Sequence, residues 1–151
     1  MRAVIQRVDE AIVTVGKGTV GQIGHGLMVL LGVEENDTQE DIAWLSSKIC
    51  KLRIFRDEGD SKNFSVMDTD GEVLVVSNFT LHANVKKGNR PTYIKAAGAE
   101  VSEPIYEAFV NQLEKDMGKP VKTGKFGAMM KVSLVNDGPV TIIIDTKNKE
   151  L

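Results

Sequence analysis

The chain has 151 residues and a mass of 16.5 kDa, and 42% of its residues are hydrophobic and 26% charged. This is the size and composition of one globular domain, and it excludes a disordered, collagen-like or coiled-coil protein. With 19 basic and 21 acidic residues the formal net charge is −2, so any contact with nucleic acid has to come from local clusters of basic side chains.

The first third of the chain is predicted to form strands. Alternating apolar residues indicate strands at 4–8 and 11–15, before a turn at 16–18, and the almost wholly apolar run 27–33 is typical of a strand buried on both faces. That run is too short to cross a bilayer, and no signal-peptide stretch precedes it. We therefore expect a soluble, cytoplasmic protein without membrane contact.

A helix is predicted to follow. Thr38 and Asp41 have the spacing of a capping box, and apolar residues then recur at helical spacing, at Ile42, Leu45, Ile49 and Leu52. Cys50 lies beside this stripe and is expected to be a core residue. As the only cysteine it excludes an internal disulfide and a cysteine-rich zinc site, consistent with a reducing compartment.

The rest of the chain is predicted to continue with strands and one more helix. Residues 56–63 indicate a surface loop, and a second helix is expected to start at 102–104 and to end at Gly118. Strands are predicted at 64–68, 72–81, 121–126, 128–135 and 140–145. This order predicts an α+β fold, a single compact domain over residues 1–151 with mixed or antiparallel, barrel-like sheets and two main helices. Two helices leave the sheets incompletely covered, so a second copy of the chain is expected to cover the rest.

Standard catalytic motifs are missing from the sequence. It contains no HExxH, Walker loop, GxSxG or GxGxxG pattern, and no spacing of ligands proposes a metal site, so no metal or cofactor is expected. His25 lies in a predicted turn. His82 follows Ser77 by five positions, which on a strand would place the two side chains on opposite faces and argues against a Ser–His couple.

Two further segments are unusual. The sequence NDGPVT at 136–141 stands between two apolar strands, where a tight turn is the simplest interpretation and where X-Pro is the one bond type for which the cis form is cheap. From 82 to 99 the chain has only basic charges, and 117–136 again has lysines and no acid. These stretches are candidate phosphate-contact surfaces or plain solvated faces, and Tyr93 in the first offers a stacking surface for a single-stranded end.

Five motifs together make the sequence recognisable: MRAVIQRV at 1–8, SNFTL at 77–81, KGNRP at 87–91, GAMM at 127–130 and NDGPVT at 136–141. In this order, across nearly the whole chain, they closely resemble the D-aminoacyl-tRNA deacylases. One departure is visible, because the family has Gln where this chain has Asn78, whose amide is one methylene shorter.

The resemblance implies an enzyme of translation quality control that hydrolyses the ester between a D-amino acid and the 3′-terminal ribose of tRNA, as a homodimer and without a cofactor. It assigns catalysis to Ser77, Asn78, Phe79 and Thr80, with the Phe79 N–H as oxyanion donor. Substrate binding and the chirality filter are assigned to Gly138, Pro139 and Met129. Gly138-Pro139 is a cis dipeptide in this family and reaches across the dimer into the partner's pocket. Contacts to tRNA are expected at Lys86, Lys87 and Arg90.

Activity on glycyl-tRNA and rejection of L-aminoacyl-tRNA are also expected, because a filter that blocks L side chains cannot refuse glycine. Thr80 has been regarded in the family as a nucleophile, but no base is near it in the sequence, and we expect a positioning role. Two alternatives stay open at this point: a non-catalytic module that binds tRNA or DNA ends, and a hydrolase of small-molecule esters.

Overall fold

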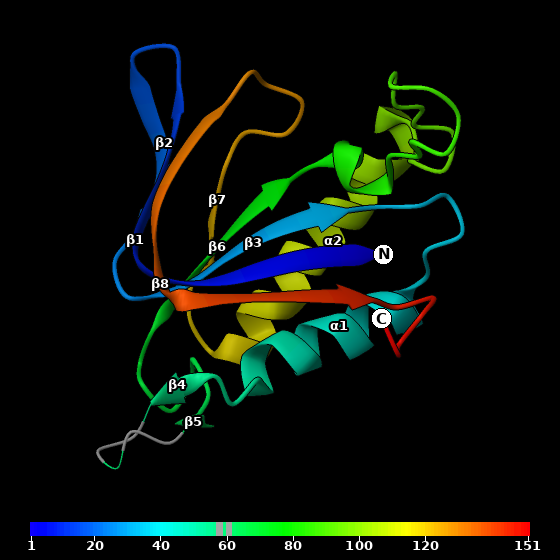
Figure 1. Ribbon diagram of the computed structural model, residues 1–151. Coiled ribbons are helices and arrows are strands. Elements are labelled where there is room, and N and C mark those ends of the chain that lie inside the picture. The colour runs from blue at the N-terminus through cyan, green and yellow to red at the C-terminus, as the bar shows by residue number, and fades with distance from the viewer. Residues whose placement is uncertain (57–58, 60–61) are drawn as a thin grey trace.

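The structure is a computed structural model that describes residues 1–56, 59 and 62–151, and it has the predicted α+β architecture (Figure 1). Its larger elements are β1 (Arg2–Val15), β2 (Gly18–Ile23), β3 (Gly26–Gly32), α1 (Gln39–Lys51), β6 (Glu72–Ser77), α2 (Ala99–Met117) and β8 (Lys131–Asp145). The short ones are β4 (Phe55–Arg56), β5 (Lys62–Phe64), the 3₁₀ helix η1 (Phe79–His82) and β7 (Lys122–Thr123). In Figure 1, α2 passes behind the sheet and α1 lies below β8.

The main sheet is mixed and nearly closed into a barrel. Its strands run in the order β2-β1-β3-β6-β7, and β8 pairs with β1. β3 lies in the middle, antiparallel to β1 and parallel to β6, and it is buried along almost its whole length, as predicted. The two ends meet at Gly21 of β2, where a Cβ atom would overlap the carbonyl oxygen of Thr123 in β7. Only glycine permits this approach of the two strands.

The predicted start of the first helix and the predicted end of the second are confirmed. α1 starts with the capping box of Thr38 and Asp41, and α2 ends at Gly118, whose φ of 71° is the left-handed C-cap that glycine favours. Cys50 is buried as expected. The predicted start of α2 at 102–104 is wrong: the helix begins at Ala99, and Pro104 lies inside it. Pro104 is the sixth residue of α2, so it lies beyond the first turn, where proline is favoured, and it removes one backbone hydrogen bond of the helix.

Several predicted strands have different bounds in the structure. The segments 4–8 and 11–15 belong to one continuous strand, β1, and most of the predicted strand 64–68 forms turns after β5. The predicted strand 72–81 stops at Ser77, where the chain turns into η1, and only β7 remains of 121–126. Residues 57, 58, 60 and 61 of the predicted loop 56–63 lie outside the described residues.

The predicted turn at 136–141 is also wrong, because β8 runs through it as one strand. Val8 of β1 pairs with Asn136 and Gln6 pairs with Thr141, so residues 137–140 bulge opposite Arg7 alone. A bulge keeps the pairing with β1 on both sides while it re-aims the residues at its tip. The peptide bond between Gly138 and Pro139 in this bulge is cis.

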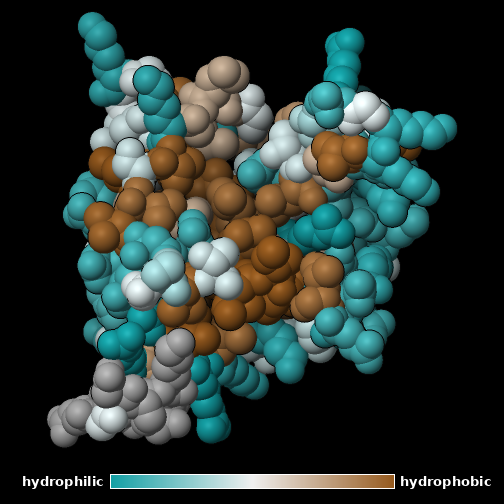
Figure 2. Space-filling model, viewed as in Figure 1, coloured by the Kyte–Doolittle hydropathy of each residue, from teal (hydrophilic) through white to brown (hydrophobic). Residues whose placement is uncertain are grey.

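The open face of the sheet, opposite the helices, is apolar. Figure 2 shows hydrophobic side chains gathered over the middle of the face formed by β8, β1 and β3. The pairing of the strands places Ile143, Val4 and Leu30 side by side in one row, and Ile143 is 49% exposed. None of the helices in the described part of the chain is long and apolar enough to cross a membrane.

Candidate active site

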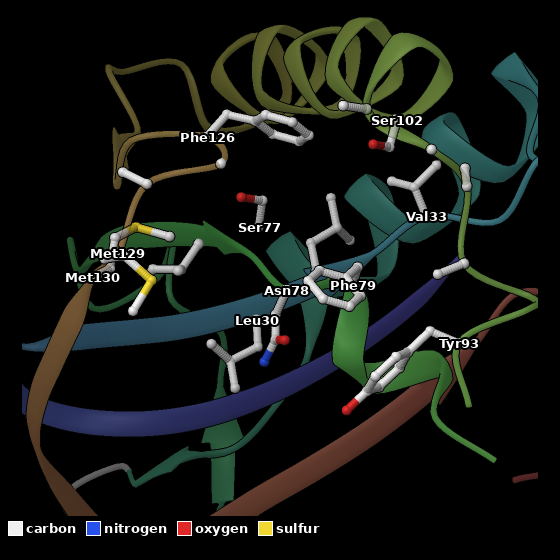
Figure 3. Close-up of a pocket in the computed structure, with 18 of the residues that line it drawn as sticks. Leu30, Val33, Ser77, Asn78, Phe79, Tyr93, Ser102, Phe126, Met129 and Met130 are labelled. Carbon is white, nitrogen blue, oxygen red and sulfur yellow. The ribbon is translucent and has the colours of Figure 1, made fainter. Parts of the chain in front are cut away.

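A cavity of about 720 Å³ opens where β6 ends (Figure 3). Its wall comes from β3, β6 and η1, from the start of α2, and from the segment 126–130 that leads into β8. Figure 3 shows Ser77 and Phe79 pointing into this space, with Phe126 and Ser102 above them. Most of the lining is apolar, and the described residues that line it include no Asp, Glu, His, Lys, Arg or Cys. The described lining therefore offers no carboxylate, imidazole or amine as a general base.

The turn from β6 into η1 presents a backbone donor at the cavity. The Asn78 N–H donates to the Leu31 carbonyl at 2.8 Å, which continues the pairing with β3 by one residue. Phe79 then begins η1, and its N–H has no hydrogen-bond partner among the described residues, as is usual for the first residue of a helix. A free N–H beside an apolar cavity is the kind of group that stabilises an oxyanion.

The Asn78 side chain holds this turn in shape. Its Oδ1 accepts hydrogen bonds from the Thr80 N–H at 3.1 Å and from the Thr80 hydroxyl at 2.5 Å. Ser77, Asn78 and Phe79 line the cavity, whereas Thr80 is not among the lining residues. The structure thus brings three of the four predicted catalytic residues to the cavity. The Thr80 hydroxyl lies outside the cavity lining and donates its hydrogen bond to Asn78.

Two residues hold η1 in place through contacts outside the cavity, and neither was assigned a role from the sequence. His82 is buried, and its Nδ1 lies 3.1 Å from Glu34 Oε1. Arg2 donates from Nη1 to the Leu81 carbonyl at 2.8 Å. The prediction that His82 and Ser77 point to opposite faces assumed a strand, which is wrong, and no hydrogen bond joins the two in the described structure. The anchors depend on contacts between distant segments, which no local pattern reveals.

The predicted chirality filter lies away from this cavity within the same chain. Gly138 and Pro139 are exposed on the bulge of β8, and neither lines the cavity. The bulge is supported from below by Arg7, which is buried and donates from Nε to the Asp137 carbonyl at 3.2 Å and from Nη1 to the Ile54 carbonyl at 2.5 Å. Met129, by contrast, is at the cavity and 91% exposed.

The predicted basic cluster lies on an exposed loop next to the cavity. Asn84 and Thr92 pair through two backbone hydrogen bonds of 2.8 and 3.0 Å and close the loop between them. Lys86, Lys87 and Arg90 are exposed on it, and none of them forms an ion pair within the described part of the chain. The loop leads directly to Tyr93 at the rim of the cavity.

Comparison with known proteins identifies the family. A sequence model described as D-Tyr-tRNA(Tyr) deacylase matches residues 4–145. The chain belongs to the D-Tyr-tRNA(Tyr) deacylase family. Among its relatives, the D-aminoacyl-tRNA deacylase of Flavobacterium psychrophilum is 60% identical over 150 residues, which cover 99% of this chain and all of the relative. The D-aminoacyl-tRNA deacylase of Chromobacterium violaceum is 55% identical with the same coverage.

Solved structures share the fold of this chain. A protein described as c-Myc DNA unwinding element binding protein superimposes with a TM-score of 0.92 and 45% identity, over 97% of this chain and 99% of that one. A probable eukaryotic D-amino acid tRNA deacylase superimposes with a TM-score of 0.84, over 95% and 98% of the two chains. The identity to the second is 18%, so it supports the fold alone.

Proposed function

We propose that this protein hydrolyses the ester that joins a D-amino acid to the 3′-terminal ribose of tRNA and releases both. The observation that carries the proposal is the N–H of Phe79, which has no hydrogen-bond partner among the described residues and lies beside an apolar cavity whose described lining has no carboxylate or imidazole. An aminoacyl ester is already activated, and the neighbouring ribose 2′-hydroxyl can assist water or attack itself. The protein then has to position the ester and stabilise the developing oxyanion, which the Phe79 N–H does by hydrogen bonding.

The residues around Phe79 have supporting roles in this mechanism. Ser77 directs its hydroxyl into the cavity and offers a hydrogen bond to the bound ester (Figure 3). Asn78 fixes η1, and through it the direction of the Phe79 N–H, by accepting from Thr80. Thr80 acts as a hydrogen-bond donor to Asn78 and not as a nucleophile, because its hydroxyl is already engaged by Asn78 Oδ1 and an amide oxygen is not a base.

We propose that a second copy of the chain completes the site. Gly138 and Pro139 lie outside their own cavity, whereas the apolar row of Ile143, Val4 and Leu30 ends at the cavity through Leu30. A partner docked on this open face would cover the row, since large exposed apolar surfaces mark interaction sites. The same docking would bring the Gly138-Pro139 bulge of each copy toward the cavity of the other.

A rigid cis dipeptide in the cavity would act as a chirality filter. When the ester carbonyl and the amino group of the substrate are both held, the backbone of the bulge blocks the direction in which an L side chain would point. Discrimination of about 10⁴-fold requires on the order of 5.5 kcal/mol, which steric overlap and unpaired polar groups can supply. Glycine has hydrogen in both positions, so glycyl-tRNA passes the filter and is hydrolysed.

The exposed basic loop fits a substrate with a phosphate backbone. Lys86, Lys87 and Arg90 are exposed on the loop that leads to Tyr93 at the cavity, and phosphate contacts of this kind weaken as salt rises. Removal of D-amino acids from tRNA is part of translation quality control, and we place the protein in the cytoplasm on this ground. The same loop would also serve a non-catalytic module for tRNA or DNA ends, and the name of the 45% identical structure refers to DNA binding.

A paired time course tests the proposal. The protein is mixed with D-tyrosyl-tRNA, L-tyrosyl-tRNA and glycyl-tRNA, and loss of the ester is followed at low and high salt. We expect hydrolysis of the D and glycyl esters, none of the L ester above background, and slower turnover at high salt under subsaturating substrate. Binding without ester loss would favour the nucleic-acid-binding module. Equal hydrolysis of both tyrosyl enantiomers would contradict the chirality filter, and hydrolysis of free D-tyrosine esters with no salt effect would favour a small-molecule hydrolase.

A further inference from the structure

At the mouth of the cavity, two aromatic side chains form an exposed pair. Phe79 and Tyr93 meet edge to face, with ring centroids 5.1 Å apart and an angle of 80° between the ring planes. Phe79 is 57% exposed and Tyr93 38% exposed, and both border the cavity. In an edge-to-face pair, each ring has at least one face that the other ring does not cover. The pair therefore presents a free aromatic face at the entrance (Figure 3).

This aromatic face is held in place by the backbone on both sides. Thr92 is paired with Asn84 directly before Tyr93. After it, the Tyr93 carbonyl accepts from the Ala96 N–H at 3.0 Å, and the Ala97 N–H donates to the Val33 carbonyl at 2.9 Å. Tyr93 is thus fixed between the basic loop and β3. A surface that is ordered before binding loses little entropy when it binds.

The charge around the pair identifies the class of ligand. Residues 84–99 carry the basic side chains Lys86, Lys87, Arg90 and Lys95 and no acidic one. An aromatic face beside exposed cations matches a single-stranded nucleic acid, whose bases stack on the rings while its phosphates contact the cations. An apolar protein segment would make no favourable contact with these cations, and a phosphate alone would make none with the rings.

We propose that the Phe79–Tyr93 pair is a stacking platform for the penultimate nucleobase of the tRNA 3′ end. The inference rests on the proposed function, in which the ester lies at the Phe79 N–H. The terminal adenosine then occupies the cavity of about 720 Å³, which is large enough for a nucleoside. The next nucleotide has to leave through the mouth, where it passes between the rings and the basic loop.

Platform stacking makes this contact tolerant of base identity. Every base has a π face, so the pair contributes affinity without reading sequence. Stacking of one base on aromatic side chains changes affinity by about 5-fold to 150-fold at the usual one to three kcal/mol. The platform would favour the flexible CCA end over a free adenosine ester.

Two small substrates distinguish the contribution of the penultimate base from that of its phosphate. One is D-tyrosyl-CpA, and the other is its analogue with an abasic ribose in place of the cytidine, which keeps the same phosphate. The quantity measured is the ratio of kcat/KM for the two. We expect a ratio of about 5 or more in the wild-type protein, close to 1 in Tyr93→Ala and close to the wild-type value in Tyr93→Phe. Ile94→Ala is the matched control, because Ile94 is the adjacent residue, 90% exposed and outside the cavity lining, and it should keep the wild-type ratio.

Each other outcome is decisive as well. A wild-type ratio of 1, with both substrates hydrolysed, would overturn the platform and leave the deacylase function intact. A loss in Tyr93→Ala that is equal for both substrates would also overturn it, since Tyr93 would then contact the terminal adenosine or support the site. Failure of the wild-type protein to hydrolyse D-tyrosyl-CpA, its analogue and D-tyrosyl-tRNA would contradict the proposed function itself.

Discussion

The Arg7 guanidinium lies directly beneath Gly138. Its Nη2 is 3.2 Å from the position that a Cβ on Gly138 would occupy, and the same Nη2 has no hydrogen-bond partner among the described residues. Arg7 also carries the bulge through an ion pair of 3.1 Å with Asp137. A buried guanidinium nitrogen without a hydrogen-bond partner costs free energy. We infer that Arg7 keeps this position because it holds the Gly138-Pro139 bulge in place.

Gly138→Ala should therefore damage both stability and activity. The φ of Gly138 is 133°, which L residues rarely adopt, and the added Cβ would lie 2.8 Å from the Val140 backbone nitrogen and side chain. We expect a loss of about 1–3 kcal/mol in the free energy of unfolding, measured by urea denaturation, and a loss of turnover on D-tyrosyl-tRNA and glycyl-tRNA alike.

The matched control for this substitution is Gly118→Ala. Gly118 also has a positive φ, of 71°, but nothing lies within 4 Å of its Cβ position, and it caps α2 far from the bulge in sequence. It should lose stability by about 1 kcal/mol and keep its specific activity when folded. Full activity in folded Gly138→Ala would contradict a role of the bulge in the site.

Thr80→Ala should keep measurable turnover. The substitution removes the hydrogen bond from the Thr80 hydroxyl to Asn78 but keeps the one from its N–H, so η1 loses part of its lock. We expect kcat on D-tyrosyl-tRNA to fall by about 3-fold to 30-fold, corresponding to roughly 0.7–2 kcal/mol for one positioning hydrogen bond. Thr80→Ser restores the hydroxyl and should recover most of the rate. Complete loss of turnover in a folded Thr80→Ala would support the nucleophile hypothesis.

Local sequence signals predicted some elements around the turn from β6 into η1 and missed others. The apolar run of β3, the capping box at Thr38 and the left-handed cap at Gly118 are local signals, and each was predicted correctly. The end of β6 at Ser77 was missed, because alternation continues into η1 and only the Asn78 cap stops the strand. The ring pair of Phe79 and Tyr93 joins residues 14 positions apart through a loop, which no periodicity shows.

The bulge gives the opposite case. The sequence at 136–141 has every mark of a turn, and a turn was predicted, yet β1 supplies partners on both sides and draws the segment into β8. Long-range pairing overrides local turn propensity here. The resemblance to a family identified Gly138 and Pro139 as a unit, and the cis bond between them is present. Their distance from the cavity of the same chain follows only from the fold.

Ile143→Asp should separate the two copies that we propose. Ile143 lies near the C-terminal end of β8 on the open face, next to Val4, and a charge there cannot be buried against a partner without a large cost. We expect the protein to change from dimer to monomer in light scattering and its deacylase activity to fall to background, with the unfolding transition retained. Val101→Asp is the control, since Val101 is 38% exposed on α2 behind the sheet. A wild-type monomer with full activity would contradict the shared site.

Stability should depend on pH through Asp41. Burial alone would raise the pKa of this carboxyl, but hydrogen bonds from Lys147 at 2.8 Å and from Thr38 outweigh burial and hold the pKa well below its usual value. A carboxyl with a lower pKa in the folded state than in the unfolded state stabilises the fold above the unfolded pKa of about 3.9, and this contribution is lost as the pH falls through the folded pKa. We expect the free energy of unfolding from urea titrations to be nearly constant between about pH 5 and 7 with respect to this group, and to fall below about pH 4. Asp41→Asn removes the titration, so its deficit relative to the wild-type protein should shrink as the pH is lowered from 6 to 3. A deficit that stays constant over this range would contradict the assignment, because the Asp41 charge would then contribute nothing to stability.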